Sequence, residues 1–423
     1  MAPGSVPSVL FLPLSAQLED PDTIAWSRGV PLLVAEGLGQ VTSVPTCFAI
    51  WTTGSGPDMR MCHLQAAAPA EHVAAYGQAA GATIAFTGLA SWHGDSFMRW
   101  DVVAMDGRGQ VARIDVQTDG PRQRADVARA SWLTAVKGLG LQGAPLPASL
   151  RTRSDEAMIS YARDREAVWS RRRRNLPTDR LGYRYLLSSL TCDPQYEAPV
   201  REIYRRAGES LVGTTGDWDT GRPLRAEARS ALETVVRLRA RDHVAWTLLG
   251  MLNRADDRLN AAREALSMAA ALSPDYGPAH RELGSVLLDL GQLQKAGAHL
   301  RKAGALAPRD PEVHLYLGGL YVATAQRTSA TDHLRAVLKL AAGTVAAGQA
   351  ARLLRDLDEG PVRTVTNPLA GRGERRGRED HHRSRDRALI AHTFDFSEVV
   401  PTRMAQVSLQ IDETSDLDVT FTD

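Results

Sequence analysis

The sequence has little that would mark a secreted, membrane-embedded or metal-binding protein. Its three cysteines, Cys47, Cys62 and Cys192, are an odd number and lack the C-x-x-C spacing of metal ligands. We therefore expect no disulfide framework, and we expect the protein to reside in a reducing compartment. No window approaches the ~20 apolar residues of a membrane span. The first 15 residues lack a basic region, and their apolar run is short for a secretory signal. These absences predict a soluble, cytoplasmic protein without a membrane partner.

Charge of one sign is also lacking, as are the common catalytic motifs. Lys and Arg total 50 against 49 Asp and Glu. This balance gives no general reason to expect nucleic acid or an acidic membrane as a partner. The sequence has no G-x-S-x-G, H-E-x-x-H or Walker motif. We predict that the chain is not an enzyme and needs no cofactor. Its 423 residues predict two or three domains.

A repeat with a period of 34 residues is present between His243 and about Lys339. Each copy has a large residue, then Leu-Gly, then Ala and Leu at fixed spacing. The large residues are Trp246, His280 and His314; the Leu-Gly pairs begin at Leu249, Leu283 and Leu317; the alanines are Ala262, Ala296 and Ala330; the last leucines are Leu266, Leu300 and Leu334. Several positions that recur at one period indicate a repeat architecture.

The residue types at these positions indicate pairs of helices. Gly and Ala suit places where two helices approach closely. Leu266 and Leu300 are expected to fill the space between one hairpin and the next. Pro274 and Pro308, which lack a backbone N–H, are expected to open the following helix. The pattern resembles the tetratricopeptide repeat. That resemblance implies a solenoid whose first helices line a concave face that binds a protein or peptide segment.

Further helices extend the predicted solenoid to residues 150–358. Residues 154–171 pair with 179–190, and residues 199–211 pair with 224–238, as two degenerate hairpins. Residues 344–357 form an end helix, whose outer face should be polar because nothing stacks on it.

Residues 1–140 are predicted to form a small mixed α/β domain in the order β-α-β-α-β-β-β-α. Its strands are expected at 8–14, 45–51, 82–89, 96–105 and 109–116, and its helices at 22–38, 69–80 and 122–137. The stretches VLFLPLSAQLEDPDTIAWSRGVPLLVAEGL and GATIAFTGLASWHGDSFMRWDVVAMDGRGQV resemble the amino-terminal domain of TolB-like proteins. This resemblance implies a fold and a bacterial signalling context rather than a chemistry. The overall fold class is thus α+β, with a sheet domain followed by an all-α solenoid and a partly disordered tail.

The carboxy-terminal tail has two parts. Residues 359–388 are predicted to be a basic, flexible linker, because they contain almost no apolar residues. Residues 389–423 are acidic and hydrophobic, and 405–411 and 416–421 alternate as strands do. They form either a β-hairpin or a segment that docks on this solenoid or on another molecule, since a lone hairpin is marginal. One hypothesis is that this tail folds back into the concave face as an autoinhibitor.

Several motifs suggest chemistry, but a structural role is favoured for each. The cysteines with His63, His72 and His93 fit no known ligand pattern, so buried structural residues are expected. His280 and His314 either line the groove or, as is favoured, pack against the neighbouring hairpin. The glycine pairs Gly37/Gly39 and Gly138/Gly140 resemble phosphate loops superficially. The first pair follows a predicted helix, however, where glycine acts as a C-cap.

Two arginine-rich stretches leave a second function open. Arg171–Arg174 and residues 372–387 are candidate phosphate-binding runs, although a solvated turn and a flexible linker are the favoured interpretations. The primary prediction is a non-catalytic scaffold or adaptor. The repeat register places five candidate partner-binding residues on its inner helices: Asn253, Arg254, Arg281, Tyr316 and Tyr321. The alternatives are a nucleic-acid-associated regulator and an enzyme of unrecognised type in the amino-terminal domain.

Overall fold

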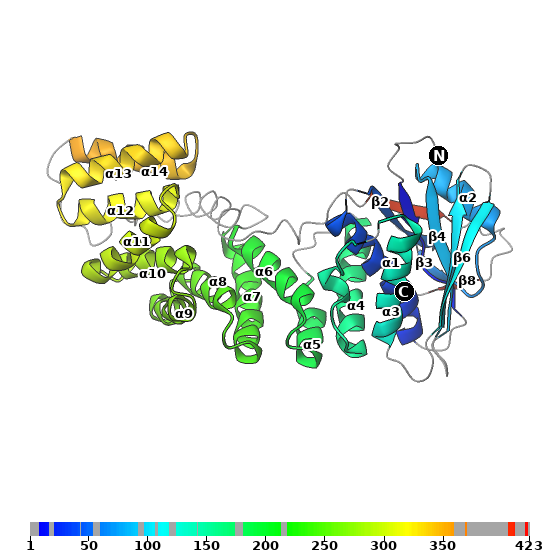
Figure 1. Ribbon diagram of the computed structural model, residues 1–423. Coiled ribbons are helices and arrows are strands. Elements are labelled where there is room, and N and C mark those ends of the chain that lie inside the picture. The colour runs from blue at the N-terminus through cyan, green and yellow to red at the C-terminus, as the bar shows by residue number, and fades with distance from the viewer. Residues whose placement is uncertain are drawn as a thin grey trace. The chain divides into compact units, whose positions relative to one another are not determined.

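The computed structural model divides into two compact units (Figure 1). The first unit combines Met1–Val200 with Glu398–Asp423, and the second unit is Arg201–Ser397. The structure describes residues 8–16, 21–42, 44–53, 60–91, 97–105, 109–117, 124–141, 143–173, 181–212, 218–358, 369, 405–410 and 419–421. A mixed sheet followed by an array of helical hairpins confirms the predicted fold class. None of the helices in these ranges combines the length and the apolar character needed to cross a membrane.

The first unit is built on a mixed sheet. Its strands are β1 (Val9–Phe11), β2 (Thr46–Thr53), β3 (Arg60–Leu64), β4 (Ile84–Ser91), β5 (Phe97–Ala104), β6 (Gly109–Gln117), β7 (Ala405–Gln410) and β8 (Val419–Phe421). Strand β1 lies between β2 and β4 and runs parallel to both. Strands β4, β5 and β6 follow as an antiparallel meander, as expected for neighbours joined by short turns.

Side chains of β1 and β2 alternate between two apolar layers, as the two-residue period of a strand requires. Leu10 and Trp51 pack with Val73 of α2 (Ala70–Ala79). On the other face, Phe11 stacks on Phe86 with ring centroids 4.9 Å apart. The helices α1 (Pro21–Val41), α3 (Arg124–Gly138) and α4 (Asp155–Arg173) pack against one another in the same unit. The sheet therefore has apolar residues on both faces.

The predicted tail strands are present, but they do not pair with each other as a hairpin. Strand β7 runs parallel to β2, with Val407 opposite Ala49. Strand β8 runs antiparallel to β3, with Thr420 opposite His63. The described part of residues 389–423 therefore belongs to the sheet unit, and the hypothesis that these strands fold onto the solenoid is wrong. The linker prediction for 359–388 lies outside the described residues, except at Leu369.

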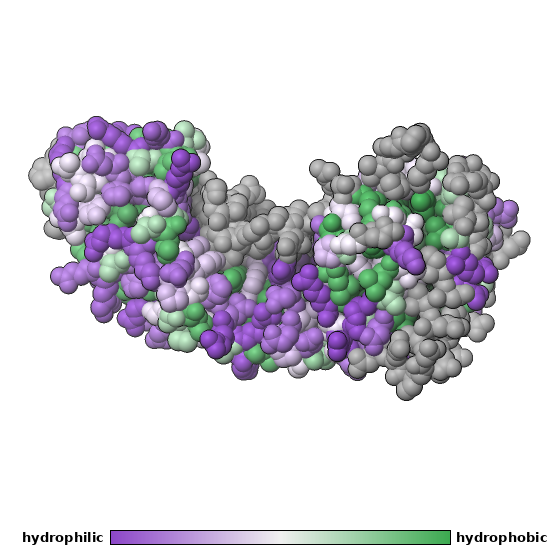
Figure 2. Space-filling model, in the orientation of Figure 1, coloured by the Kyte–Doolittle hydropathy of each residue, from purple (hydrophilic) through white to green (hydrophobic). Residues whose placement is uncertain are grey.

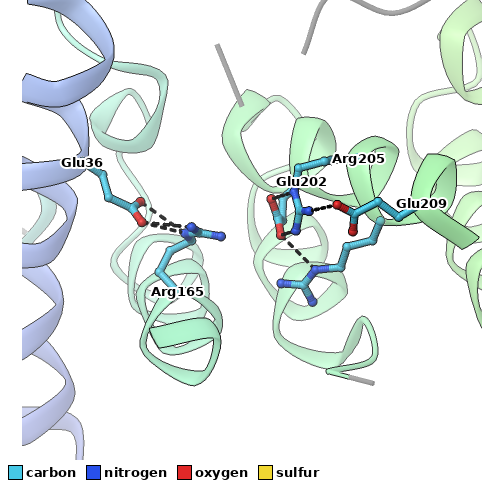
Figure 3. A network of polar contacts seen from close by, with 6 residues as sticks. Glu36, Arg165, Glu202, Arg205 and Glu209 are labelled. Carbon is cyan, nitrogen blue, oxygen red and sulfur yellow. Dashed lines mark hydrogen bonds and ion pairs between the residues drawn. The ribbon is translucent and has the colours of Figure 1, made fainter. Parts of the chain in front are cut away.

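Buried ion pairs hold α4 against α1. The guanidinium of Arg165 donates from Nε and Nη2 to Glu36 Oε1 at 3.0 Å each, and both side chains are buried (Figure 3). Arg28, on the same helix as Glu36, pairs with Glu166 at 2.8 Å. Helix α5 (Arg184–Cys192) packs on α4. The first degenerate hairpin thus packs within the sheet unit, whereas the domain limits 1–140 and 150–358 stay a prediction.

The second unit contains the regular hairpins. Its helices are α6 (Glu197–Val212), which begins in the first unit, α7 (Trp218–Leu238), α8 (His243–Ala255), α9 (Leu259–Leu272), α10 (Gly277–Asp289), α11 (Leu293–Leu306), α12 (Pro311–Ala323), α13 (Arg327–Leu340) and α14 (Val345–Asp358). Helices α8 and α9, α10 and α11, and α12 and α13 pack as pairs. The three repeats and the end helix are confirmed.

The Leu-Gly positions explain the close approach within each hairpin. A Cβ built on Gly250 would lie 2.4 Å from Cγ of Leu266, and one on Gly284 would lie 2.5 Å from Cγ of Leu300. Gly318 meets Leu334 in the same way, at 2.7 Å. The prediction for glycine is confirmed. Leu266 and Leu300 fit against the glycine of their own hairpin, and they also lie in the core cluster that includes residues of the following hairpin.

Other local predictions need correction. Strand β3 was not predicted. Gly37 does not cap α1 but lies inside this helix, which continues to Val41. A Cβ at Gly37 would lie 2.6 Å from Cγ of Pro147, so the glycine permits close packing. Pro274 precedes α10, which begins at Gly277, so it does not open that helix.

Candidate partner-binding face of the solenoid

Ion pairs connect successive hairpins of the array. Arg225 of α7 donates to Asp256 at 2.8 Å, and Arg254 of α8 donates to Asp289 at 2.8 Å. Arg281 of α10 donates to Asp310, just before α12, at 2.6 Å. Each bond joins one hairpin to the next, so the stacking of the repeats is fixed by charge as well as by apolar packing.

Most of the five predicted partner-binding residues make internal contacts. Arg281 is 2% exposed, and Tyr316 is 1% exposed. The hydroxyl of Tyr316 accepts from Nη1 of Arg254 at 3.4 Å, and Asn253 is also buried. Tyr321 is half-buried, with its ring stacked on His333. Arg254 and Tyr321 are thus the most accessible of the five, and partner binding by all five stays a prediction.

Two pairs of histidines occupy equivalent places in successive hairpins. Nδ1 of His280 lies 2.9 Å from Nδ1 of His299, and Nδ1 of His314 lies 2.8 Å from Nδ1 of His333. Nε2 of His280 donates to the carbonyl oxygen of Pro274 at 2.9 Å, so its Nδ1 must accept when the ring is neutral. Each pair therefore links the two helices of one hairpin. The favoured prediction, packing against the neighbouring hairpin, is replaced by bonding within the same hairpin.

The first hairpin has different residues at the positions of the two histidines. Nε1 of Trp246 donates to the carbonyl oxygen of Ala240 at 2.9 Å, the same bond that His280 makes six residues back. The position 34 residues before His299 is Ala265. The positions held by Trp246 and Ala265 in one hairpin are thus held by two histidines in the next. Burial lowers the pKa of His280, His299 and His333 below the ordinary value.

Leu369 contacts the face of α12 from outside the repeats. A Cβ built on Gly319 would lie 2.8 Å from Cδ1 and 2.9 Å from Cγ of this leucine. Leu369 packs against the core shared by α9–α12 and also against the core shared by α12, α13 and α14. Sequence reasoning did not identify this contact, because a single leucine in a polar segment carries no periodic signal.

The other candidate sites have structural explanations where the structure describes them. Among the described residues, no three His, Cys, Asp or Glu side chains gather as metal ligands would; His93 lies outside that set. Burial raises the pKa of Cys47 and Cys62 to about 11, so both thiols stay protonated and unreactive. Burial, with the charge of Arg28 adding to it, lowers the pKa of His63 to about 3. His72 is exposed on α2.

The arginine-rich stretches remain largely untested by the structure. Arg171–Arg173 end helix α4, whereas Arg174 and residues 372–387 lie outside the described residues. On the face drawn in Figure 2, hydrophilic residues predominate over α8–α14, with hydrophobic residues scattered among them. Exposed large apolar side chains include Met268, Leu306 and Leu340, on the second helices of the three hairpins.

No family model matches the sequence, and no curated protein matches it. Among solved structures, a crystal structure of MamA is 21% identical, covers 43% of this chain and 95% of its own length, and has a TM-score of 0.33. TTC0263, a TPR protein of Thermus thermophilus, is 20% identical over 46% of this chain and 98% of its own, with a TM-score of 0.33. YrrB, described as a TPR protein with an unusual peptide-binding site, is 17% identical over 45% and 96%, with a TM-score of 0.28. At these values the likeness carries no conclusion about what this chain binds.

Proposed function

We propose that this chain is a non-catalytic adaptor that holds a segment of another protein against the first helices of its solenoid. The observation that carries the proposal is the identical construction of three successive hairpins, each closed by a leucine on a glycine. Stacked hairpins in one register present equivalent helix faces side by side, and solenoids use such extended surfaces to bind partners. The ion pairs between hairpins keep that surface in one arrangement, which reduces the ordering cost of binding.

The finer parts of the proposal rest on the sequence. The TolB-like resemblance of the first domain favours a role in a bacterial signalling assembly, and the low cysteine content favours the cytoplasm. Arg254 and Tyr321 are the candidate contacts, since they are the most accessible of the predicted residues on the first helices.

Affinity capture from nuclease-treated cytoplasm of the native host, with the full chain as bait, tests this function. The expected result is a discrete protein that rebinds the purified chain at a stoichiometric ratio. Material that is captured from untreated cytoplasm but not from nuclease-treated cytoplasm would contradict the adaptor function. It would support the alternative, a regulator that binds nucleic acid through its arginine-rich stretches. For that alternative, binding to DNA or RNA would weaken steeply with salt, because phosphate contacts release counterions.

A further inference from the structure

The side chain of Leu369 occupies a space that a glycine provides. The three atoms nearest to a Cβ built on Gly319 all belong to Leu369, at 2.8, 2.9 and 3.7 Å. The two shorter separations are below ordinary van der Waals contact, so any side chain at position 319 would have to share this space with the leucine. Gly319 is buried. A leucine and a glycine from separate parts of the unit are thus sterically complementary.

The surroundings of Gly319 are apolar. Leu315, Gly319 and Val322 are spaced i, i+4 and i+7, so they share one face of α12. Leu315 and Val322 are buried with Leu353 and Leu357 of α14 in one cluster, and Leu369 packs against that cluster. The leucine therefore lies where the first helix of the last repeat meets the end helix.

The repeat register shows that this space is particular to the last of the three hairpins. The residues 34 and 68 positions before Gly319 are Ser285 and Met251. Both side chains are buried, at 1% and 4% exposure. Only the third of these equivalent positions lacks a side chain, and it is the one that Leu369 contacts.

We infer that Gly319 and its apolar neighbours form a leucine-binding site on α12, and that the chain's own Leu369 is its resident ligand. Leu369 lies 11 residues after the end of α14 at Asp358. A flexible tether of this length, which the sequence predicts for residues 359–388, gives an effective concentration on the order of millimolar, and this favours the internal ligand over a free peptide. A proline directly before Leu369 in the sequence disfavours helix in the residue ahead of it, so we expect the site to take a leucine from a non-helical segment.

This inference deepens the proposed function, since a partner segment with a similarly placed leucine would have to displace Leu369. The two ideas can fail separately, because the internal contact is tested without any partner. Strands β7 and β8 belong to the sheet unit, so the self-contact on the solenoid comes from a different part of the tail.

Disulfide trapping in the full chain tests the contact. In a C192S background, which removes the exposed cysteine, the variant G319C/L369C is compared with G348C/L369C under oxidised glutathione. Gly348 is a matched control, because it is an exposed glycine of α14 with nothing within 4 Å of its built Cβ. The expected result is cross-linking at least ten-fold faster for the position 319 pair. Equal rates, or no cross-link at position 319, would overturn the inference.

A second variant tests displacement without cysteines. Gly319→Met introduces the residue of the first hairpin, Met251, and replaces a poor helix former with a good one, so the helix is retained. Trypsin should cleave after Arg363 and Arg372 several-fold faster in this variant than in wild type, whereas Gly348→Met should leave the rate unchanged. Identical cleavage in both variants and in wild type would mean that Leu369 is not held at this site.

Discussion

At the scale of single residues, the two histidine pairs bear most directly on how the hairpins respond to acid. When both histidines of a pair are neutral, one Nδ1 donates a hydrogen bond to the other. When both rings are protonated, both Nδ1 atoms carry a proton, so two donors would point at each other. Burial lowers the pKa of His280 and His299 in the folded chain. Lys302 adds to this effect for both, whereas Asp275 opposes it for His280.

We predict that His280→Trp with His299→Ala, which copies Trp246 and Ala265, makes the solenoid less sensitive to acid. Below about pH 6.5 the unfolded chain binds protons that the folded pair resists. Stability of the wild type therefore falls as the pH falls from that value, and the variant loses this contribution. Urea unfolding at pH 8 and pH 5, followed by amide exchange in α10 and α11, measures the difference.

His72→Ala is the control for that experiment, because it removes an exposed histidine from α2 and leaves both pairs intact. The control should keep the wild-type pH dependence of α10 and α11. A paired variant whose stability falls with acid as steeply as that of the wild type would contradict the account.

The buried ion pair of Glu36 and Arg165 gives a second prediction at this scale. Arg165→Met leaves the carboxylate of Glu36 buried without its partner, which should cost about 3–5 kcal/mol. Glu36→Met/Arg165→Met removes both charges and should cost much less. The exposed pair Arg113–Asp101 is a matched control, since breaking it should cost about 1 kcal/mol or less. Amide exchange in α1 reports the change, and equal costs for the single and double variants would contradict this interpretation.

Residue-scale features differed in how far the sequence could predict them. The residues Gly250, Gly284 and Gly318 were predictable, because their close approach recurs with the period of the repeat. The partners of His280 and Arg165 were not. His280 and His299 lie on two different helices, α10 and α11, that are joined by a turn. Glu36 lies 129 residues from Arg165. Such contacts depend on the packing of elements, for which local sequence carries no signal.

At the scale of elements, the turn within each hairpin contains one residue with left-handed backbone. Asp257, Gly291 and Ala325 are equivalent by the 34-residue period and have φ of 61°, 73° and 57°. Glycine adopts this conformation without steric cost, whereas alanine does not. Gly291→Ala should destabilise its hairpin by about 1 kcal/mol, and Ala325→Gly should stabilise by roughly 0.5–1 kcal/mol. Urea unfolding of the two variants measures both signs, and equal signs would contradict the argument.

Strand β7 gives a further prediction at this scale. Val407→Pro removes a backbone N–H from the strand that pairs with Cys47–Thr52 of β2. Amide protons of β2 should therefore exchange faster in this variant. Thr414→Pro, which falls in neither β7 nor β8, should leave their exchange unchanged. Unchanged exchange in Val407→Pro would mean that the tail does not protect β2.

Most elements were predictable from apolar periodicity, and the exceptions have physical reasons. Strand β3 is five residues long and mixes Arg60 and His63 with apolar residues, so no alternation stands out. The tail strands β7 and β8 were recognisable by alternation. Their partners β2 and β3 were not, because pairing across more than 350 residues leaves no local pattern.

At the scale of the whole molecule, the chain combines a sheet unit completed by strands from its own carboxy-terminal region with a solenoid of regular hairpins. The predicted sequence of a mixed sheet domain and a helical repeat array is confirmed. Partner binding by the five predicted residues stays a prediction. Arg281 and Tyr316 are buried in internal contacts, which the repeat register could not show because it identifies a helix face but not the neighbours that cover it.

The most direct test of the central claim measures the affinity of the captured partner for the purified full chain by titration calorimetry. Tyr321→Ala alters the first helix of the last hairpin, and Met268→Ala alters an exposed side chain on the second helix of the first. We predict that Tyr321→Ala weakens binding at least ten-fold and that Met268→Ala leaves it unchanged. Equal affinity for all three proteins, or a loss confined to Met268→Ala, would contradict a partner site on the first helices of the solenoid.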